Sequence, residues 1–75
     1  MSINLLLLED EVNVGSTVKD RLQMEGYQVS WAQSLAEAKK VLLSTPVSLA
    51  LLDVNLPDGS GFDLGRLIRQ EHPEV

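Results

Sequence analysis

The stretch LALLDVNLPDGSGFDL, from Leu49 to Leu64, is the most informative part of this 75-residue chain. Its apolar run is typical of a parallel strand that is buried on both faces. The run ends in Asp53, and the turn-forming residues 57–59 follow before a helical pattern begins. A carboxylate at the end of a buried strand must reach water or be held for a purpose. Asp53 is therefore the residue that a functional interpretation has to explain.

Outward from this stretch, short apolar runs alternate with segments of helical spacing. This alternation predicts repeated strand–helix units that build a parallel sheet. The expected strands are residues 3–8, 27–32 and 47–52. The first helix should end at Gly26, the second should run from a capping box at residues 34–37 through Leu43, and the third should be capped by Ser60 and ended by Pro73. The expected apolar stripes of the three helices are Val14, Val18 and Leu22; Leu35, Ala38 and Leu42; and Leu64, Leu67 and Ile68.

Length, composition and charge narrow the class of protein. The 75 residues allow one domain, and the absence of cysteine excludes disulfides and thiolate metal sites. The formal net charge of −5 argues against direct binding of nucleic acid by this segment. The apolar run at residues 3–8 is too short to cross a bilayer and lacks a basic leader. We therefore expect a cytoplasmic protein, in agreement with the lack of cysteine.

The ends of the first and third strands carry the acidic residues. In open parallel sheets, ligands bind beyond the carboxyl ends of the strands, where the strand order reverses. With the order 2-1-3, Glu9 and Asp10 should leave the sheet beside Asp53. Like charges this close need a compensating cation, and an oxygen-only cluster suits Mg²⁺. The sequence therefore predicts a magnesium site in which Asp53, at the end of the strand expected to be most deeply buried, is the best placed nucleophile toward a phosphoryl group.

Three stretches carry a resemblance to a known family: LLLLEDE at residues 5–11, the Gly26-Tyr27 helix exit and the stretch 49–64. They resemble the receiver domain of bacterial two-component response regulators. The third stretch is most similar to the subfamily whose receivers precede a winged-helix DNA-binding domain. The resemblance implies a flavodoxin-like α/β fold, a doubly wound parallel sheet. It also implies a histidine kinase as the partner that donates the phosphoryl group.

The same resemblance implies roles for individual residues. Asp53 would be the phosphoacceptor, Asp10 a direct Mg²⁺ ligand, Glu9 a ligand through water, and Asn55 a ligand through its backbone carbonyl. Pro57 and Gly59 match the turn of the family. By this reading the chain is a signalling module and not an enzyme.

The family's receivers have five strand–helix units, whereas residues 1–75 supply three. The family's phosphate-binding Ser or Thr and its Lys belong to the fourth and fifth units. We therefore expect residues 1–75 to be the N-terminal part of a receiver, inactive or strongly impaired in phosphotransfer by itself. DNA binding would belong to an output domain outside this segment.

Two other functions stay open. The first is an assembly module without phosphotransfer. We expect the third strand to be a free edge and Leu64, Leu67 and Ile68 to form an exposed apolar patch, so that two copies join through residues 47–52 and 61–72 in a symmetric or swapped homodimer. A metal-dependent phosphohydrolase typically has a second Asp two residues after the nucleophile, where this chain has Asn55. Trp31 and Tyr27 are expected to pack on the sheet rather than to stack on a nucleic acid.

Overall fold

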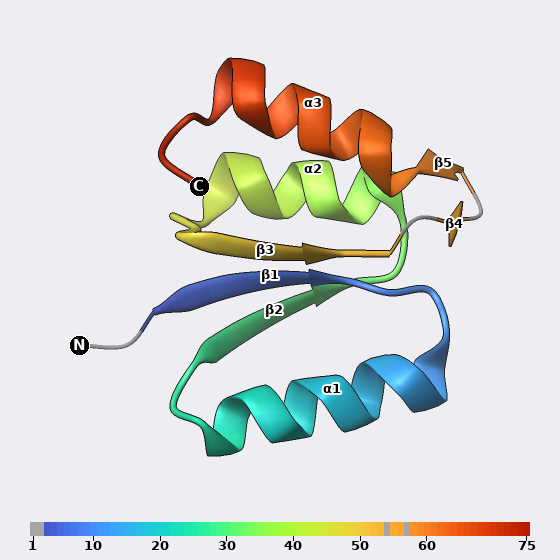
Figure 1. Ribbon diagram of the computed structural model, residues 1–75, viewed down its shortest axis with the longest axis vertical. Coiled ribbons are helices and arrows are strands. Elements are labelled where there is room, and N and C mark those ends of the chain that lie inside the picture. The colour runs from blue at the N-terminus through green and yellow to red at the C-terminus, as the bar shows by residue number, and fades with distance from the viewer. Residues whose placement is uncertain (1–2, 54, 57) are drawn as a thin grey trace.

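The computed structural model of the chain describes residues 3–53, 55, 56 and 58–75 (Figure 1). Strands and helices alternate through most of the chain, as the sequence predicts. Their order is β1 (Asn4–Leu8), α1 (Val12–Met24), β2 (Gln28–Ala32), α2 (Leu35–Ser44), β3 (Leu49–Leu52), β4 (Asn55–Leu56), β5 (Gly59–Ser60) and α3 (Gly61–Glu71). Within the described residues, no helix is both long and apolar enough to cross a bilayer.

The main sheet is parallel and has the order β2-β1-β3. Leu8 of β1 lies level with Ala32 of β2 and Leu52 of β3, so the three strands end together at the carboxyl end of the sheet. In Figure 1, α1 covers one face of this sheet, and α2 and α3 lie over the other. The predicted doubly wound α/β fold and its strand order 2-1-3 are confirmed.

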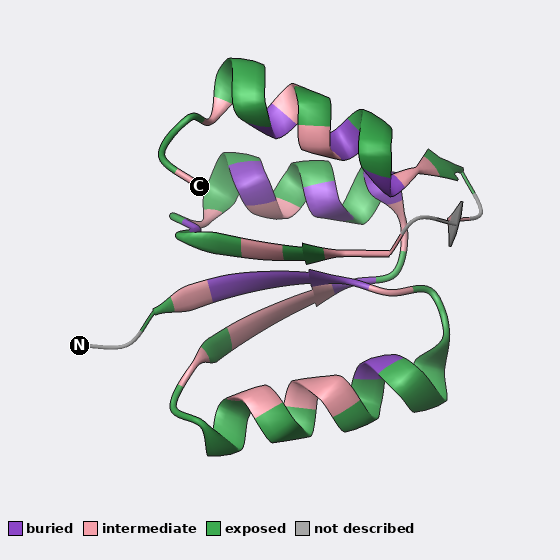
Figure 2. Cartoon of the chain, in the orientation of Figure 1, coloured by how far each residue is buried: buried purple, intermediate pink, exposed green. Residues whose placement is uncertain are grey.

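The face under α2 and α3 is a closed apolar core (Figure 2). Leu6 and Leu8 of β1 are almost fully buried there. The expected stripe of α2 is also buried: Leu35, Ala38 and Leu42. Leu64 and Ile68 of α3 are buried in the same cluster, and Leu67 is partly buried against it. The expectation that Leu64, Leu67 and Ile68 form an exposed patch is therefore wrong, because α3 lies across β3 and beside α2 and turns this stripe into the core.

The face under α1 is only half covered. Leu5 and Leu7 of β1 are buried, but Leu49 and Leu51 of β3 are 46% and 43% exposed. Val14 of α1 is also exposed, although the helical spacing places it on the buried stripe. The reason is that α1 packs over β1 and β2 and leaves the outer face of β3 uncovered.

The expectation that the strand before Asp53 is the most deeply buried is wrong as well. Four of the five residues of β1 are buried, whereas exposed and half-buried residues alternate along β3. The apolar run is continuous in both strands, so the sequence cannot distinguish a central strand from one at the edge of the described sheet. The carboxyl end of β3 still lies beside that of β1, which is what the site requires.

The predicted helix caps are confirmed. The Ser34 hydroxyl accepts a hydrogen bond from the backbone N–H of Glu37 at 3.2 Å, and the Ser60 hydroxyl accepts one from Phe62 at 3.1 Å. Helix α3 ends two residues before Pro73, as expected. Pro57 lies outside the described residues, and the expected turn around it is bordered by the short antiparallel pair β4 and β5. Hydroxyl groups therefore define the starts of both helices that cover the core.

Candidate metal centre

Hydrogen bonds beyond the strands bring the ends of β1, β2 and β3 together. The N–H of Glu9 donates to the carbonyl of Ala32 at 3.0 Å, and the N–H of Asp53 donates to the carbonyl of Leu8 at 2.9 Å. The first bond extends the pairing of β1 with β2 by one residue, and the second extends the pairing of β1 with β3 by one residue. The backbone positions of Glu9 and Asp53 are therefore fixed by the sheet itself.

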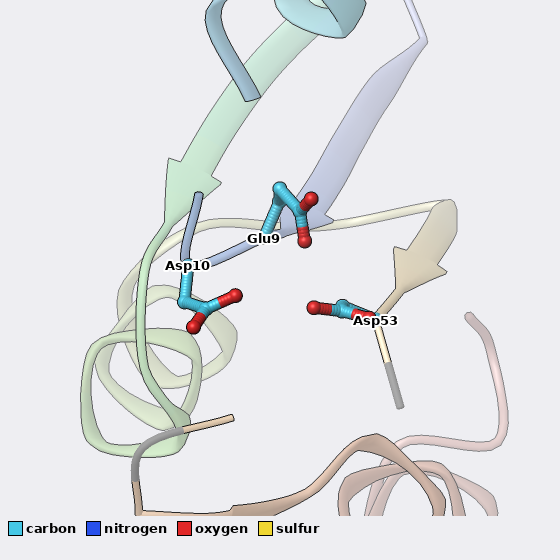
Figure 3. A group of neighbouring side chains, drawn as sticks. All are labelled: Glu9, Asp10 and Asp53. Atoms are coloured by element: carbon cyan, nitrogen blue, oxygen red, sulfur yellow. The ribbon is translucent and has the colours of Figure 1, made fainter. Parts of the chain in front are cut away.

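Three carboxylates meet at the carboxyl end of the sheet. One oxygen each of Glu9, Asp10 and Asp53 lies within 4.8 Å of the other two. Figure 3 shows Glu9 and Asp10, from the segment after β1, facing Asp53 from the end of β3. Glu9 and Asp53 are half-buried and Asp10 is exposed. The structure thus brings together the three side chains that the sequence singled out.

The cluster is electrostatically strained in the absence of a cation. The pKa of Glu9 is raised from 4.5 to about 7, chiefly by a hydrogen bond between the side chains of Glu9 and Asp53. Burial and the negative charges of Asp53, Asp10 and Glu11 raise it further. A proton shared between Glu9 and Asp53 relieves the repulsion between them. A bound divalent cation would relieve the same repulsion and displace that proton.

The donor set suits a hard divalent cation. Mg²⁺ binds oxygen at about 2.0–2.1 Å, so two oxygens bound directly to one ion are at most about 4.2 Å apart. A spread of up to 4.8 Å among the carboxylate oxygens therefore fits a site with both direct and water-mediated ligands. Partial exposure leaves room for those waters. By donor type and spacing, these residues fit the magnesium ion that the sequence predicts.

The predicted fourth ligand, the carbonyl of Asn55, belongs to the segment that follows Asp53. Asn55 begins β4 and is paired with Ser60 of β5. Its role toward a metal stays a prediction.

Asp58 has a role that the sequence did not reveal. Its two carboxylate oxygens accept hydrogen bonds from the backbone N–H groups of Leu35 at 2.8 Å and Ala36 at 3.1 Å. These bonds lower the pKa of Asp58, the bond from Leu35 having the largest effect. Asp58 thereby ties the segment after β3 to the first turn of α2. The sequence indicates only a turn former, because the partners lie 22 and 23 residues away.

Two other residues fix the backbone of the cluster. A Cβ atom on Gly61 would lie 1.9 Å from the carbonyl oxygen of Asp53, so only glycine lets the start of α3 approach Asp53 this closely. The indole N–H of Trp31 donates to the carbonyl of Glu9 at 2.9 Å. The expected packing role of Trp31 is therefore incomplete. Neither contact has a local signal in the sequence.

The chain is similar in sequence to known proteins. Residues 5–75 match the family model described as the response regulator receiver domain. The chain is 37% identical over 59 residues to the swarming motility regulation protein RssB of Serratia marcescens, covering 79% of this chain and 27% of that protein. It is 36% identical over 70 residues to the TorCAD operon transcriptional regulatory protein TorR of Escherichia coli O157:H7, covering 93% of this chain and 30% of that protein.

Solved structures agree in fold. The non-phosphorylated HemR receiver domain of Leptospira biflexa is 36% identical with a TM-score of 0.91, over 99% of this chain and 60% of that one. The response regulator TrrA of Thermotoga maritima in complex with Mg²⁺-BeF is 32% identical with a TM-score of 0.89, over 95% of this chain and 62% of that one. TrrA is also similar in its complex with the histidine kinase ThkA, with a TM-score of 0.90 at 32% identity over 97% of this chain and 63% of that one.

Proposed function

This chain belongs to the response regulator receiver domain family, and on that premise we propose that Asp53 accepts a phosphoryl group from a histidine kinase in the presence of Mg²⁺. The observation that carries the proposal is the convergence of the Glu9, Asp10 and Asp53 carboxylates within 4.8 Å. The similarity to transcriptional regulators such as TorR agrees with a receiver of the subfamily that precedes a winged-helix domain.

In the proposed reaction, a carboxylate oxygen of Asp53 attacks the phosphorus atom of a phosphohistidine. The new bond joins that oxygen to phosphorus, and the bond between phosphorus and the histidine nitrogen breaks. The electron pair of the broken bond stays on the nitrogen of the leaving histidine. A magnesium ion, held by Asp10 and Asp53 directly, by Glu9 through water and by the Asn55 carbonyl, would supply positive charge against the phosphoryl oxygens.

Asp53 suits the role of phosphoacceptor better than its neighbours do. Its backbone is fixed on one side by the bond to Leu8 and on the other by the close approach of Gly61. Its side chain is only half-buried, so a phosphoryl donor can reach it. Asp10 is exposed, and Glu9 lies on the segment that also supplies Asp10. Catalysis of phosphoryl transfer depends mainly on positioning, and the sheet and the start of α3 together position the backbone of Asp53.

The extent of the chain bears on how well it would react. The 75 residues span about 60% of the matched receiver structures and less than a third of the curated relatives RssB and TorR. We propose that they form the N-terminal part of a receiver. In the family, a Ser or Thr and a Lys from the fourth and fifth units contact the phosphoryl group. A polypeptide limited to residues 1–75 would therefore transfer phosphoryl groups slowly or not at all.

Labelling with a small phosphodonor tests the proposal. The full-length protein is incubated with acetyl phosphate and Mg²⁺, and the modified residue is located by mass spectrometry. We expect labelling at Asp53 that requires Mg²⁺ and is absent in Asp53→Asn. The control is Asp20→Asn, an exposed carboxylate on α1. Labelling that is independent of Mg²⁺, or that persists in Asp53→Asn, would contradict the proposal.

Partners and location belong to the same proposal. A histidine kinase is the expected phosphodonor, in line with the solved ThkA–TrrA complex. The net charge of −5 makes direct nucleic-acid binding by these residues unfavourable, so DNA binding would come from an output domain. A cytoplasmic location fits both partners.

Self-association is a second candidate function, because one edge of the sheet carries an apolar surface. Among the described residues, β3 pairs with β1 alone, and it exposes Leu49 and Leu51. A cavity of about 440 Å³ follows the same edge, lined by Leu52, Gly61, Phe62, Gly65, Arg66 and Arg69. Residues 47–52 and 61–72 therefore remain the proposed contact surface between two copies. The contact would use the edge and outer face of β3 together with Phe62, which is 69% exposed, because Leu64 and Ile68 are buried.

A further inference from the structure

The backbone of Glu9 is held by β2 on both sides of its Cα atom. The N–H of Glu9 donates to the carbonyl of Ala32 at 3.0 Å. The carbonyl of Glu9 accepts from the indole Nε1–H of Trp31 at 2.9 Å. The second bond fixes the peptide that joins Glu9 to Asp10. One side chain of β2 therefore constrains the backbone from which two of the three clustered carboxylates project.

Helix α1 is shaped to receive this indole. A Cβ atom on Gly15 would lie 2.2 Å from Cζ2 of Trp31 and 2.7 Å from its Nε1. Gly15 is also the buried residue of α1. Glycine inside a helix is unfavourable relative to alanine, so its presence here needs a reason. The ring of Trp31 occupies the space where any side chain at position 15 would lie.

We propose that Trp31 is a positioning residue for the acidic cluster, and that Gly15 is the complement that admits its ring. The indole N–H of Trp31 bonds to the backbone carbonyl of Glu9 and not to a carboxylate oxygen. It acts through the Glu9–Asp10 peptide, which it holds so that both side chains face Asp53. This inference rests on the proposed metal-binding function of the cluster.

The test replaces the hydrogen-bond donor and keeps the ring. Trp31→Phe retains an aromatic ring over Gly15 but has no N–H for the Glu9 carbonyl. We expect the dissociation constant for Mg²⁺, measured by calorimetry on the full-length protein, to rise about threefold to tenfold, the range that the net loss of one hydrogen bond produces. In the metal-free protein, NMR order parameters should fall at the amides of Glu9 and Asp10.

The control is Val29→Ala. Val29 lies on the same strand and face as Trp31, is half-buried, and pairs with Leu5. It should lower stability but leave the Mg²⁺ affinity and the order parameters at residues 9 and 10 unchanged. Gly15→Ala is a second variant, which favours the helix but displaces the indole. It should weaken Mg²⁺ binding without lowering the helix content measured by circular dichroism.

The outcomes separate this inference from the proposed function. If the wild-type protein binds Mg²⁺ and Trp31→Phe binds it equally well with unchanged order parameters, the positioning role is wrong. If the wild-type protein binds no Mg²⁺, the metal function fails and the positioning role fails with it, even where the phenylalanine variant loosens residues 9 and 10. A loss of affinity in Val29→Ala equal to that in Trp31→Phe would also overturn the role, because a general weakening of β2 would explain both.

Discussion

The two faces of the sheet are built from alternate residues of the same strands, yet they differ in how completely they are covered. On the face under α2 and α3, Leu6, Leu8 and Leu64 are at most 1% exposed. On the face under α1, Leu49 and Leu51 are 46% and 43% exposed. The closed face holds the fold together, whereas the open face leaves apolar surface next to the acidic cluster.

The largest expected difference between the faces is in stability. Leu64→Ala removes a buried side chain from the closed face and should lower the free energy of unfolding by about 2–5 kcal/mol. Leu51→Ala on the open face should cost about 1 kcal/mol or less, because Leu51 is already 43% exposed. Urea unfolding followed by circular dichroism measures both. Equal costs would show that the open face is covered in solution.

The second prediction concerns assembly of the 75-residue chain. If copies associate through β3, Leu51→Lys should shift sedimentation toward the monomer or unfold the chain, because it places a charge in the contact. Lys40→Glu, on the exposed side of α2, should leave the assembly intact. A compact wild-type monomer whose melting does not depend on concentration would contradict self-association.

The third prediction concerns the two hydrogen bonds by which Asp58 ties the segment after β3 to helix α2. Asp58→Asn should lower the melting temperature at neutral pH, by less than Leu64→Ala does, because the two N–H donors of Leu35 and Ala36 lose a charged acceptor. The pKa of Asp58 is lowered in the folded chain, so its contribution is present at neutral pH and is lost as pH falls through the folded value. The difference in melting temperature between wild type and variant should therefore shrink in acid. A constant difference across pH would contradict a role for the charge.

The smallest expected effect is the pH dependence that comes from Glu9. Its pKa is about 7 in the folded, metal-free chain and 4.5 ordinarily, so between these values the folded state holds a proton that the unfolded state has released. Stability should consequently fall as pH rises from about 4.5 to 7, the opposite of the Asp58 effect. Glu9→Gln should remove this decrease of stability with pH, which is measured as the melting temperature at several pH values without metal. The same dependence of melting temperature on pH in wild type and variant would show that Glu9 does not share a proton with Asp53.

Local chemistry accounts for what the sequence predicted correctly. Ser34 and Ser60 cap helices through bonds to residues two or three positions away, so their roles are visible in short stretches. The acidic residues after two apolar runs are equally visible, and the rule that ligands bind at the carboxyl ends of parallel strands brings them together. The family of the chain follows from the same stretches.

What the sequence could not predict depends on the paths of chain segments in space. Asp58 reaches α2 and Trp31 reaches Glu9 across 22 or more residues. The exposure of Leu51 depends on which strand lies at the edge of the described sheet, and a continuous apolar run does not encode that. The burial of Leu64 likewise depends on how α3 crosses β3. Each of these features needed the three-dimensional arrangement.

We expect Glu9, Asp10 and Asp53 to bind one divalent cation together, beside the carboxylate proposed to accept the phosphoryl group. Paramagnetic broadening of amide resonances by Mn²⁺ in the full-length protein tests this. We predict selective broadening at residues 9, 10 and 53 that excess Mg²⁺ reverses, and that Asp10→Ala and Asp53→Ala each weaken while Asp20→Ala does not. Broadening spread over the acidic surface, or unchanged in the Asp10 and Asp53 variants, would contradict the claim.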